Sequence, residues 1–249
     1  MTRWEEIAAD LRIRINNGEF APGALLPRET ELMESYGASR APVRQAVAAL
    51  AEEGLVDKVR RRGTLVRNPP SRRVLTRARQ VFRDEIGYYF DPVAQPWRAL
   101  ATPTVRAEPA PADIARLLDV APATTVTTRT RLMGEPATHT PTQVATSYLH
   151  PDAVTELPVL ARPDTGPGGI YDRLEEAGHG PLAWSETITA RAATPAEREA
   201  LALRPGVPVL RIVRTARSAR GPVVEVNDTR MAADHFEVGY PLERHTSAR

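Results

Sequence analysis

The sequence predicts an α+β protein of 249 residues that divides into two domains. Within the first 67 residues, three helix-like patterns are followed by two short strand-like segments. The pattern changes after Asn68-Pro69-Pro70-Ser71, a linker signal beyond which strand-like runs outnumber helices. Strands with interspersed helices favour a mainly antiparallel sheet, which we therefore expect in the second domain.

The composition is typical of an ordinary globular chain, with 42% hydrophobic and 26% charged residues. We find no apolar run long enough to cross a membrane and no signal-peptide pattern at the N-terminus. The chain has no cysteine, and its five histidines lack a short metal-ligand spacing. We therefore expect a cytoplasmic protein with no metal site, no other cofactor and no membrane partner.

Local signals predict each element of the first domain. Apolar residues at helical spacing, a Gly37 suited to a left-handed C-cap and a Ser39 suited to an N-cap predict three helices, over Arg3–Asn16, Glu29–Tyr36 and Ser39–Glu53. Alternating apolar residues between turn signals predict short strands at Leu25-Leu26, Leu55–Val59 and Thr64–Val66. In this order the elements describe a winged helix-turn-helix.

The third helix has an open face near its start. Its buried stripe of Val43, Ala46, Val47 and Leu50 leaves Arg40 and Arg44 exposed on one side. The start of a recognition helix reaches base edges in the major groove, where arginine can contact guanine through two hydrogen bonds. We therefore expect this domain to bind double-stranded DNA.

A basic run supports this expectation. From Lys58 to Arg83 the chain has ten basic residues and no acid. Its first part is the turn Arg60-Arg61-Arg62, which would place cations beside phosphates or in the minor groove. A solvated linker is the alternative explanation of such a run.

Short motifs continue through residues 4 to 66: Pro22-Gly23, Leu26-Pro27, Glu29, Tyr36-Gly37, Ser39-Arg40, Val43-Arg44, Leu50, Glu53-Gly54-Leu55-Val56 and Arg62-Gly63-Thr64-Leu65-Val66. Together they closely resemble the GntR family of bacterial regulators. The resemblance implies a homodimer that binds a short palindromic operator and represses transcription. Taken together, the exposed helix face, the basic turn and the resemblance lead us to expect DNA contacts from Arg28, Ser39, Arg40, Ala41, Arg44, Arg61, Arg62, Gly63 and Thr64.

The sequence departs from that family pattern at three positions. Arg28 stands where a small residue is usual, and Thr30 stands where the family often has a DNA-contacting arginine. Arg61 stands where the wing often has glycine. We expect Arg28 to supply the DNA contact that Thr30 cannot make. Because of these departures, the DNA sequence of the family's half-site is not expected to apply to this protein.

The second domain is predicted as five strands, Thr125–Leu132, Gln143–Leu149, Ala183–Ala190, Val209–Ala216 and Val223–Met231, and three helices, Ala112–Leu118, Ile170–Ala177 and Pro195–Leu201. Its motifs, Thr128–Leu132, Ala145–Leu149, Ile170–Leu174, Ala192–Glu197, Pro208–Arg211 and Gly221–Val226, resemble the UTRA ligand-sensing domain of HutC-type GntR regulators. The resemblance implies a chorismate-lyase-like fold. We expect a winged helix-turn-helix over residues 1–69, a linker over 70–79 and an effector-binding, dimerising domain over 80–249.

Candidate effector residues come from one pattern and from the resemblance. Arg129 and Arg131 lie two apart on a predicted strand and so face the same side, where a pair of arginines suits a carboxylate or phosphate. Two surface residues on an edge strand are the alternative. The resemblance places both in the effector site and adds Phe82, Arg83, Tyr171 and Glu225. Because Ala145 replaces a glutamate that is common in the family, the ligands of family members cannot be assigned to this protein. We expect a small anionic or polar effector.

The aromatic group Tyr88-Tyr89-Phe90 and Trp97 is explained either by core packing or as an apolar wall for the effector. The sequence as a whole predicts a sequence-specific repressor modulated by a small molecule. The alternatives are an enzyme of chorismate-lyase-like fold and a ligand-independent DNA-binding protein. Because the sequence shows no nucleophile–base pair, we expect no catalytic residues.

Overall fold

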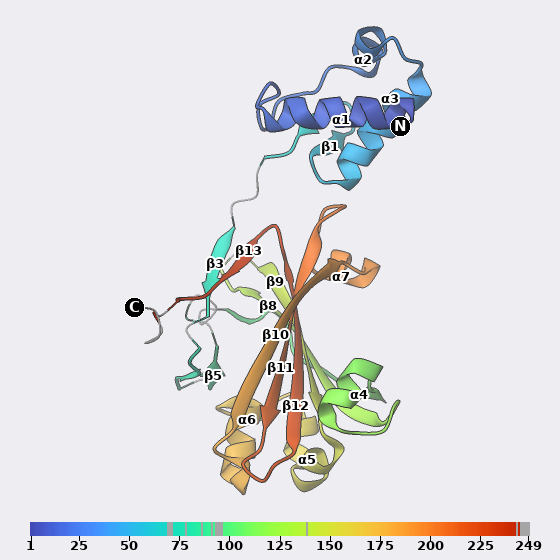
Figure 1. Cartoon of the computed structure of the whole chain (residues 1–249). Coiled ribbons are helices and arrows are strands. Elements are labelled where there is room, and N and C mark those ends of the chain that lie inside the picture. Colours follow the sequence, from blue (N-terminus) through green and yellow to red (C-terminus); the bar gives the residue numbers. More distant parts are fainter. Residues whose placement is uncertain are drawn as a thin grey trace. The chain divides into compact units, whose positions relative to one another are not determined.

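The structure is a computed structural model that describes residues 1–68, 72–77, 79–85, 87–90, 92, 97–137, 139–242 and 244. Contacts divide the chain into two compact units (Figure 1). The first holds Met1–Ser71 and Arg204–Val207, and the second holds Arg72–Leu203 and Pro208–Arg249. Among the described residues, no helix is both long and apolar enough to cross a membrane.

The first unit contains three helices and a two-stranded antiparallel hairpin: α1 Arg3–Asn16, α2 Glu29–Tyr36, α3 Arg40–Glu52, β1 Val56–Val59 and β2 Gly63–Val66. One buried cluster joins all of them, with Leu11 of α1, Leu32 of α2 and Leu50 of α3 at most 2% exposed. An isolated bridge between Leu25 and Leu65 extends the hairpin where the sequence predicts a short strand. The predicted winged helix-turn-helix is thus confirmed.

Local signals also predict the helix ends of this unit correctly. Gly37 closes α2 in the left-handed region at φ 54°, as expected of a C-cap glycine. Ser39 is the N-cap residue of α3 and has extended backbone, but its hydroxyl makes no capping hydrogen bond to the helix. The expected N-cap position is therefore correct, and the expected capping bond does not form.

The second unit is built on a seven-stranded antiparallel sheet. Its strands follow the order β10-β11-β12-β9-β8-β6, with β7 also pairing with β8. Their bounds are β6 Arg98–Ala99, β7 Thr104–Pro109, β8 Thr125–Glu135, β9 Thr140–Leu149, β10 Ala183–Ala192, β11 Pro208–Arg217 and β12 Val223–Ala232. All five predicted strands are present, so the predicted antiparallel sheet is confirmed.

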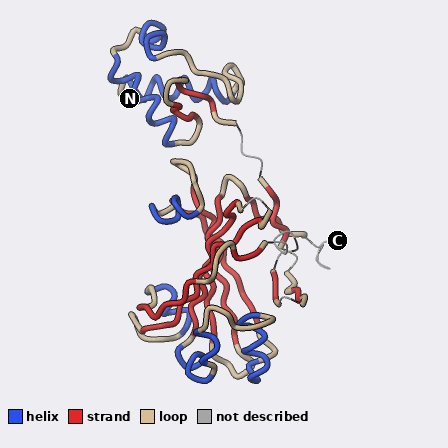
Figure 2. The backbone as a smooth tube through the Cα atoms, turned by 180° about the vertical axis from the view of Figure 1, so that it is seen from behind, coloured by secondary structure: helices blue, strands red, loops and turns tan. Residues whose placement is uncertain are grey.

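Helices pack on both faces of this sheet. On one face, α4 Ala112–Leu118 buries Ile114 and Leu118 against Val226 of β12. On the other face, α5 Pro151–Glu156, the 3-10 helix Pro158–Ala161 and α6 Gly169–Leu174 pack on strand residues that include Leu149. Figures 1 and 2 show α4, α5 and α6 near one end of the long strands and α7 Pro195–Ala200 near the other.

Four short strands pair with one another outside the main sheet and have no counterpart among the predicted elements. β3 Arg73–Thr76 pairs in parallel with β13 Phe236–Gly239, and β4 Phe82–Arg83 pairs with β5 Tyr88–Tyr89. Because β3 is part of the second unit, that unit begins inside the range predicted as a linker. Residues 70, 71 and 78 of that range lie outside the described residues. Arginines obscure the alternation of β3, and its partner strand is about 160 residues away.

Candidate functional site

The start of α3 presents the basic surface that its periodicity predicts. Arg40, Ala41 and Arg44 are exposed, whereas Val43 is fully buried in the core. The Nε of Arg40 lies 2.8 Å from Glu29 Oε1, in an ion pair whose arginine side chain is 65% exposed. Arg44 forms no ion pair with any described residue. Two guanidinium groups are therefore exposed on one side of the helix, and that of Arg40 is ion-paired with Glu29.

The residues before α2 and α3 are also open. Arg28 is exposed, and its backbone N–H donates to Glu31 Oε2 at 2.7 Å. Ser39 is exposed at the N-terminus of α3, where backbone N–H groups favour an anion. Both residues lie where a phosphate could accept hydrogen bonds from them.

The tip of the hairpin joins β1 to β2 through Arg60, Arg61 and Arg62, which are all exposed. Arg61 has a φ of 65°, a left-handed conformation that glycine adopts more readily. Gly63 has a φ of 109°, and a Cβ there would lie 3.3 Å from Leu25. Thr64 is half-buried, and its carbonyl accepts from Leu26 N–H at 2.8 Å.

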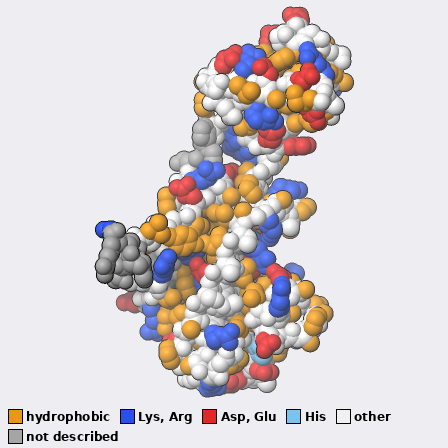
Figure 3. All heavy atoms as spheres, in the orientation of Figure 1, with side chains coloured by type: hydrophobic (Ala, Val, Ile, Leu, Met, Phe, Trp, Pro, Cys, Tyr) orange, Lys and Arg blue, Asp and Glu red, His pale blue; other side chains and the backbone are white. Residues whose placement is uncertain are grey.

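On the face of the first unit seen in Figure 3, basic side chains lie among acidic and apolar ones. That face carries no continuous basic patch, so the exposed arginines of α3 and of the hairpin tip are single candidates for contact with a polyanion.

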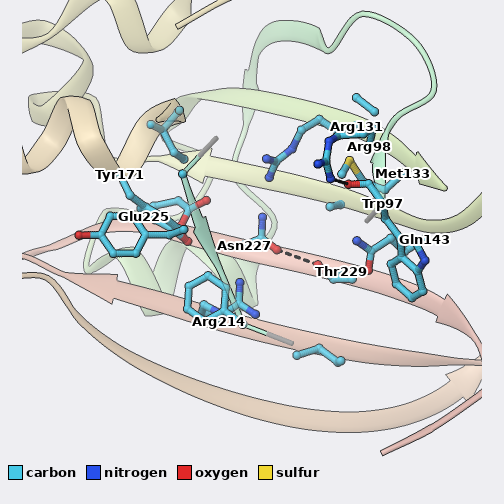
Figure 4. Close-up of a pocket in the computed structure, with 18 of the residues that line it drawn as sticks. Trp97, Arg98, Arg131, Met133, Gln143, Tyr171, Arg214, Glu225, Asn227 and Thr229 are labelled. Atoms are coloured by element: carbon cyan, nitrogen blue, oxygen red, sulfur yellow. Dashed lines mark hydrogen bonds between the residues drawn. The ribbon is translucent and has the colours of Figure 1, made fainter. Parts of the chain in front are cut away.

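A cavity of about 370 Å³ lies on the α6 side of the sheet in the second unit. Residues at alternating positions of four strands line it, which puts their side chains on one face of the sheet. These residues are Arg131 and Met133 of β8, Gln143 and Ala145 of β9, Ile212 and Arg214 of β11, and Glu225, Asn227, Thr229 and Met231 of β12. Figure 4 shows Tyr171 and Glu225 at one side of the cavity, Arg98 and Trp97 at the other, and the Arg131 side chain reaching from β8 towards the middle.

The acidic side of the cavity is a hydrogen-bonded pair. Tyr171 on α6 donates its hydroxyl to Glu225 Oε2 at 2.5 Å. Burial, and then the charge of Glu225, raise the pKa of Tyr171 far above its ordinary value, so the phenol stays neutral and keeps its proton for this bond. The second carboxylate oxygen, Oε1, is buried and has no hydrogen-bond partner among the described residues.

A polar chain crosses the floor of the cavity. Arg131 Nη2 donates to Ser147 Oγ at 3.2 Å, and Asn227 Nδ2 donates to the same oxygen at 3.0 Å. Thr229 then donates to Asn227 Oδ1 at 2.8 Å, which is the bond drawn in Figure 4. Ser147 thus sets the position of both Arg131 and Asn227.

Arg214 is held by neighbours that belong to the protein. Its Nε donates to Glu186 Oε1 at 2.7 Å, and its guanidinium lies 3.2 Å from the centroid of the Phe90 ring. Arg77, just after β3, also faces Glu186 at 3.8 Å and donates to the Phe90 carbonyl at 3.2 Å. One carboxylate therefore serves two of the arginines that line the cavity.

Arg129 shares a strand with Arg131 but has different surroundings. It is 5% exposed, and its guanidinium donates to the carbonyls of Leu160, Arg162 and Pro163. Burial lowers the pKa of Arg129, and the positive charge of Arg131 lowers it further. Arg129 is not among the described residues that line the cavity. It fixes the 3-10 segment after α5 against the sheet.

Phe82 and Arg83 lie on the β4–β5 hairpin, and neither is among the described lining residues of the cavity. Arg83 Nη2 lies 2.6 Å from Asp172 on α6. Tyr88, which does line the cavity, donates to Glu175 at 2.6 Å. These two bonds connect the hairpin to the helix that carries Tyr171.

The aromatic residues serve both purposes that the sequence leaves open. Tyr88, Phe90, Tyr171 and Trp184 pack edge-on or tilted, with centroids 5.4 to 6.0 Å apart. The first three of these rings, together with Trp97, also line the cavity. They are core residues whose inner faces form an apolar wall.

Several lining residues have no counterpart among the sequence candidates. Met133, Asn227 and Thr229 follow from strand alternation once Arg131 and Glu225 are assigned, because they lie two or four residues away. Arg98, Gln143 and Arg214 depend on strand pairing and register, for which the sequence alone gives no signal.

A Ser–His–carboxylate chain lies outside the cavity. His179 Nδ1 is 3.0 Å from Ser218 Oγ, and His179 Nε2 is 3.1 Å from Glu156 Oε2. Ser218 and His179 are 3% and 4% exposed, and the serine oxygen also accepts from Arg220 N–H. This buried chain ties the β11–β12 turn to the π-helical turn Glu175–His179. Within the described part of the chain, no group of three or more acidic or histidine side chains is arranged to hold a metal ion.

Comparisons with known proteins agree with both units. The family of bacterial regulatory proteins called gntR matches residues 3–66, and the UTRA domain family matches residues 103–237. An uncharacterized HTH-type transcriptional regulator of Streptomyces coelicolor is 33% identical over 99% of this chain and 94% of its own length. The HTH-type transcriptional repressor NagR of Bacillus subtilis is 26% identical over 96% of this chain and 94% of its own.

A solved structure has the same architecture. The crystal structure of a GntR-family transcriptional regulator has a TM-score of 0.71 and 27% identity, and it covers 98% of this chain and 99% of its own. The chain therefore belongs to the gntR family of bacterial regulatory proteins, in the HutC type that joins a winged helix-turn-helix to a UTRA domain, and it is a DNA-binding transcriptional regulator.

Proposed function

We propose that this regulator is a cytoplasmic repressor whose affinity for its operator is modulated by a small molecule bound in the cavity of the second unit. The observation that carries the proposal is that one chain has both an open recognition helix, with Arg40 and Arg44 in solvent, and a cavity with an unpartnered buried carboxylate oxygen on Glu225. The name of the relative NagR, a transcriptional repressor, supports the direction of regulation.

The DNA contacts divide by element. Arg40 and Arg44 contact guanine edges in the major groove, with Ala41 between them small enough to let α3 approach the bases. Ser39 and Arg28, at the N-termini of α3 and α2, contact phosphates. On the hairpin, Arg61 and Arg62, with Gly63 and Thr64 behind them, contact the backbone or the minor groove.

The functional unit is a homodimer on a palindromic operator. One winged helix reads only a short half-site, so two copies are needed for tight and specific binding. Residues from the 80–249 range form the dimer, and the two recognition helices lie one DNA turn apart, about 34 Å. Sedimentation at micromolar concentration tests this assembly, and a monomer would contradict it.

The effector is a small anionic or polar molecule that contacts Arg131, Tyr171 and Glu225 directly. The other candidates do not contact the effector and instead position residues that do. Phe82 and Arg83 position the hairpin that carries Tyr88, and Arg129 positions the strand that carries Arg131. Ligand and operator then change each other's affinity by the same factor, because both act on one conformational equilibrium.

The experiment begins with selection of an operator from random DNA duplexes by the full-length protein. The selected site should be palindromic, and its affinity should exceed that for random DNA at least about a thousandfold. Metabolite mixtures are then screened for one that changes this affinity. Arg131→Ala should abolish the change and keep operator affinity intact. A mutant that still responds fully would contradict the assigned site, and a protein that selects no sequence would contradict the regulator.

A further inference from the structure

Two oppositely charged side chains that line the cavity, Glu225 and Arg131, each have a buried polar atom with no hydrogen-bond partner among the described residues. Glu225 is 0% exposed, and none of the described residues donates to its Oε1. The Nε of Arg131 is also buried, and it donates to none of the described residues. Glu225 and Arg131 form no ion pair with each other, and their hydrogen-bond partners are Tyr171 and Ser147.

Charged groups nearby do have partners. Arg214 pairs with Glu186, Arg129 donates to three backbone carbonyls, and Asp172 accepts from Arg83. Buried atoms without a hydrogen-bond partner also occur outside the cavity, as at Asp172 Oδ2, but Glu225 Oε1 and Arg131 Nε are of opposite charge and belong to residues that line it.

A buried charged group without a partner costs free energy, which a ligand regains when it supplies the complementary group. Tyr171 already donates to Glu225 Oε2, so the remaining oxygen needs one more donor. A hydroxyl would supply only the hydrogen bond, whereas an ammonium group supplies the hydrogen bond and the positive charge. On the other side, Arg131 Nε needs an acceptor, and an anion supplies both the acceptor and the negative charge.

We propose that the cavity selects a bipolar ligand, with an ammonium group at one end and a carboxylate or phosphate at the other. The ammonium group donates to Glu225 Oε1, and the anion accepts from Arg131. The aliphatic part of the ligand lies against Trp97 and Phe90. A cavity of about 370 Å³ is within the range that small-metabolite sites occupy. This inference rests on the proposed effector-regulated function and names the chemical class of its effector.

The test is calorimetric titration of the full-length protein with small probes of defined charge. The bipolar probes are γ-aminobutyrate, ε-aminocaproate and aminopropyl phosphate. Their one-ended counterparts are butyrate, caproate and propyl phosphate, which lack the amine, and butylamine, which lacks the anion. We expect at least one bipolar probe to bind about tenfold or more tightly than both of its counterparts. The carboxylate and phosphate probes separate the two possible anions.

Two variants assign the ends. Glu225→Gln keeps an acceptor for Tyr171 but loses the charge, so it should remove the preference for the amine and keep the preference for the anion. Arg131→Gln should do the reverse. Glu176→Gln, which changes an exposed glutamate outside the cavity, should alter neither preference. If a cavity variant does not fold, the wild-type probe series still decides.

A series in which no bipolar probe gains over its counterparts, including one in which nothing binds, would overturn the bipolar ligand. Failure of the proposed function has a different signature, read from operator affinity in the same samples. Bipolar probes that bind tightly and leave operator affinity unchanged would support this ligand class and contradict effector regulation.

Discussion

Two arginines lie on one face of α3, Arg40 and Arg44, and two lie on one face of β8, Arg129 and Arg131. The surroundings of the two pairs differ: the first is exposed and the second lies inside the domain. Arg40 is 65% exposed and has one loose ion pair, whereas Arg129 is 5% exposed and is held by three carbonyls. In water a guanidinium group costs little to leave open for a polyanion. Inside a domain it needs partners. Arg131 lines the cavity, and its Nε has no partner among the described residues, so a ligand bound there can supply the acceptor.

The largest expected effect separates the two arginines of β8. Arg129→Ala leaves the carbonyls of Leu160 and Pro163 without their donors and should lower the free energy of unfolding of the second unit by about 3 kcal/mol. Arg131→Ala should change it by less than about 1 kcal/mol, because it loses one long hydrogen bond and one unpartnered atom. Urea titration of the two variants measures this difference. Equal losses would show that both arginines are structural.

The next largest effect concerns operator affinity and the exposed arginines of α3. Arg44→Ala removes an exposed guanidinium group with no ion pair in the described structure, so the fold should stay intact. Its affinity for the selected operator should fall by about 1–3 kcal/mol, with a much smaller loss on random DNA. Fluorescence anisotropy with both duplexes measures the two losses. A loss of the same size on both would place Arg44 on phosphate and not on a base.

Substitution of Arg61, at the tip of the β1–β2 hairpin, distinguishes the effect of its charge on DNA binding from the effect of its backbone conformation on stability. Arg61→Gly removes a cation and relieves the left-handed backbone at φ 65°. We expect the salt slope of operator binding to fall by about one unit, while stability stays equal or rises by up to about 1 kcal/mol. Arg62→Ala is the matched control: it should lower the slope to the same extent without the gain in stability. An unchanged slope in both variants would remove the wing from the DNA interface.

The smallest expected effect is a pH dependence of the stability of the second unit. A hydrogen bond from Arg191 lowers the pKa of Glu197 to about 2. Because this pKa is below that of the unfolded chain, the pair stabilises the fold above about pH 4.5, and the contribution is lost as pH falls towards 2. Glu197→Gln should cost about 1 kcal/mol at pH 7. The difference from wild type should shrink in melts at pH 3, and a constant difference would mean that packing alone is lost.

The comparison also explains how far the sequence alone can predict this molecule. The DNA surface depends on helix periodicity and turn residues, which are local, so Arg40, Arg44 and the hairpin tip follow directly from it. The cavity depends on strands that pair across long stretches of chain. The resemblance finds Arg131, Tyr171 and Glu225. Arg214 and Trp97 come into place only through the register of β11 and the pairing of β6, which follows Trp97, with β8.

The same reasoning shows where pattern alone misleads. Strand alternation correctly places Arg129 and Arg131 on one face, but it does not reveal which neighbours each one meets. The 3-10 helix Pro158–Ala161 and the residues after it, absent from the predicted elements, supply the carbonyls that occupy Arg129. A single segment that the sequence does not predict thus decides which of two identical side chains is free to bind.

The central claim is that the exposed arginines of α3 bind DNA and that Arg131, inside the second unit, does not. The most direct test compares Arg44→Ala with Arg131→Ala in one assay without ligand. Operator affinity is measured for wild type and both variants at the same salt concentration. We predict that Arg44→Ala weakens binding about tenfold or more and that Arg131→Ala stays within about twofold of wild type. A loss of operator affinity in Arg131→Ala as large as that in Arg44→Ala would contradict the account.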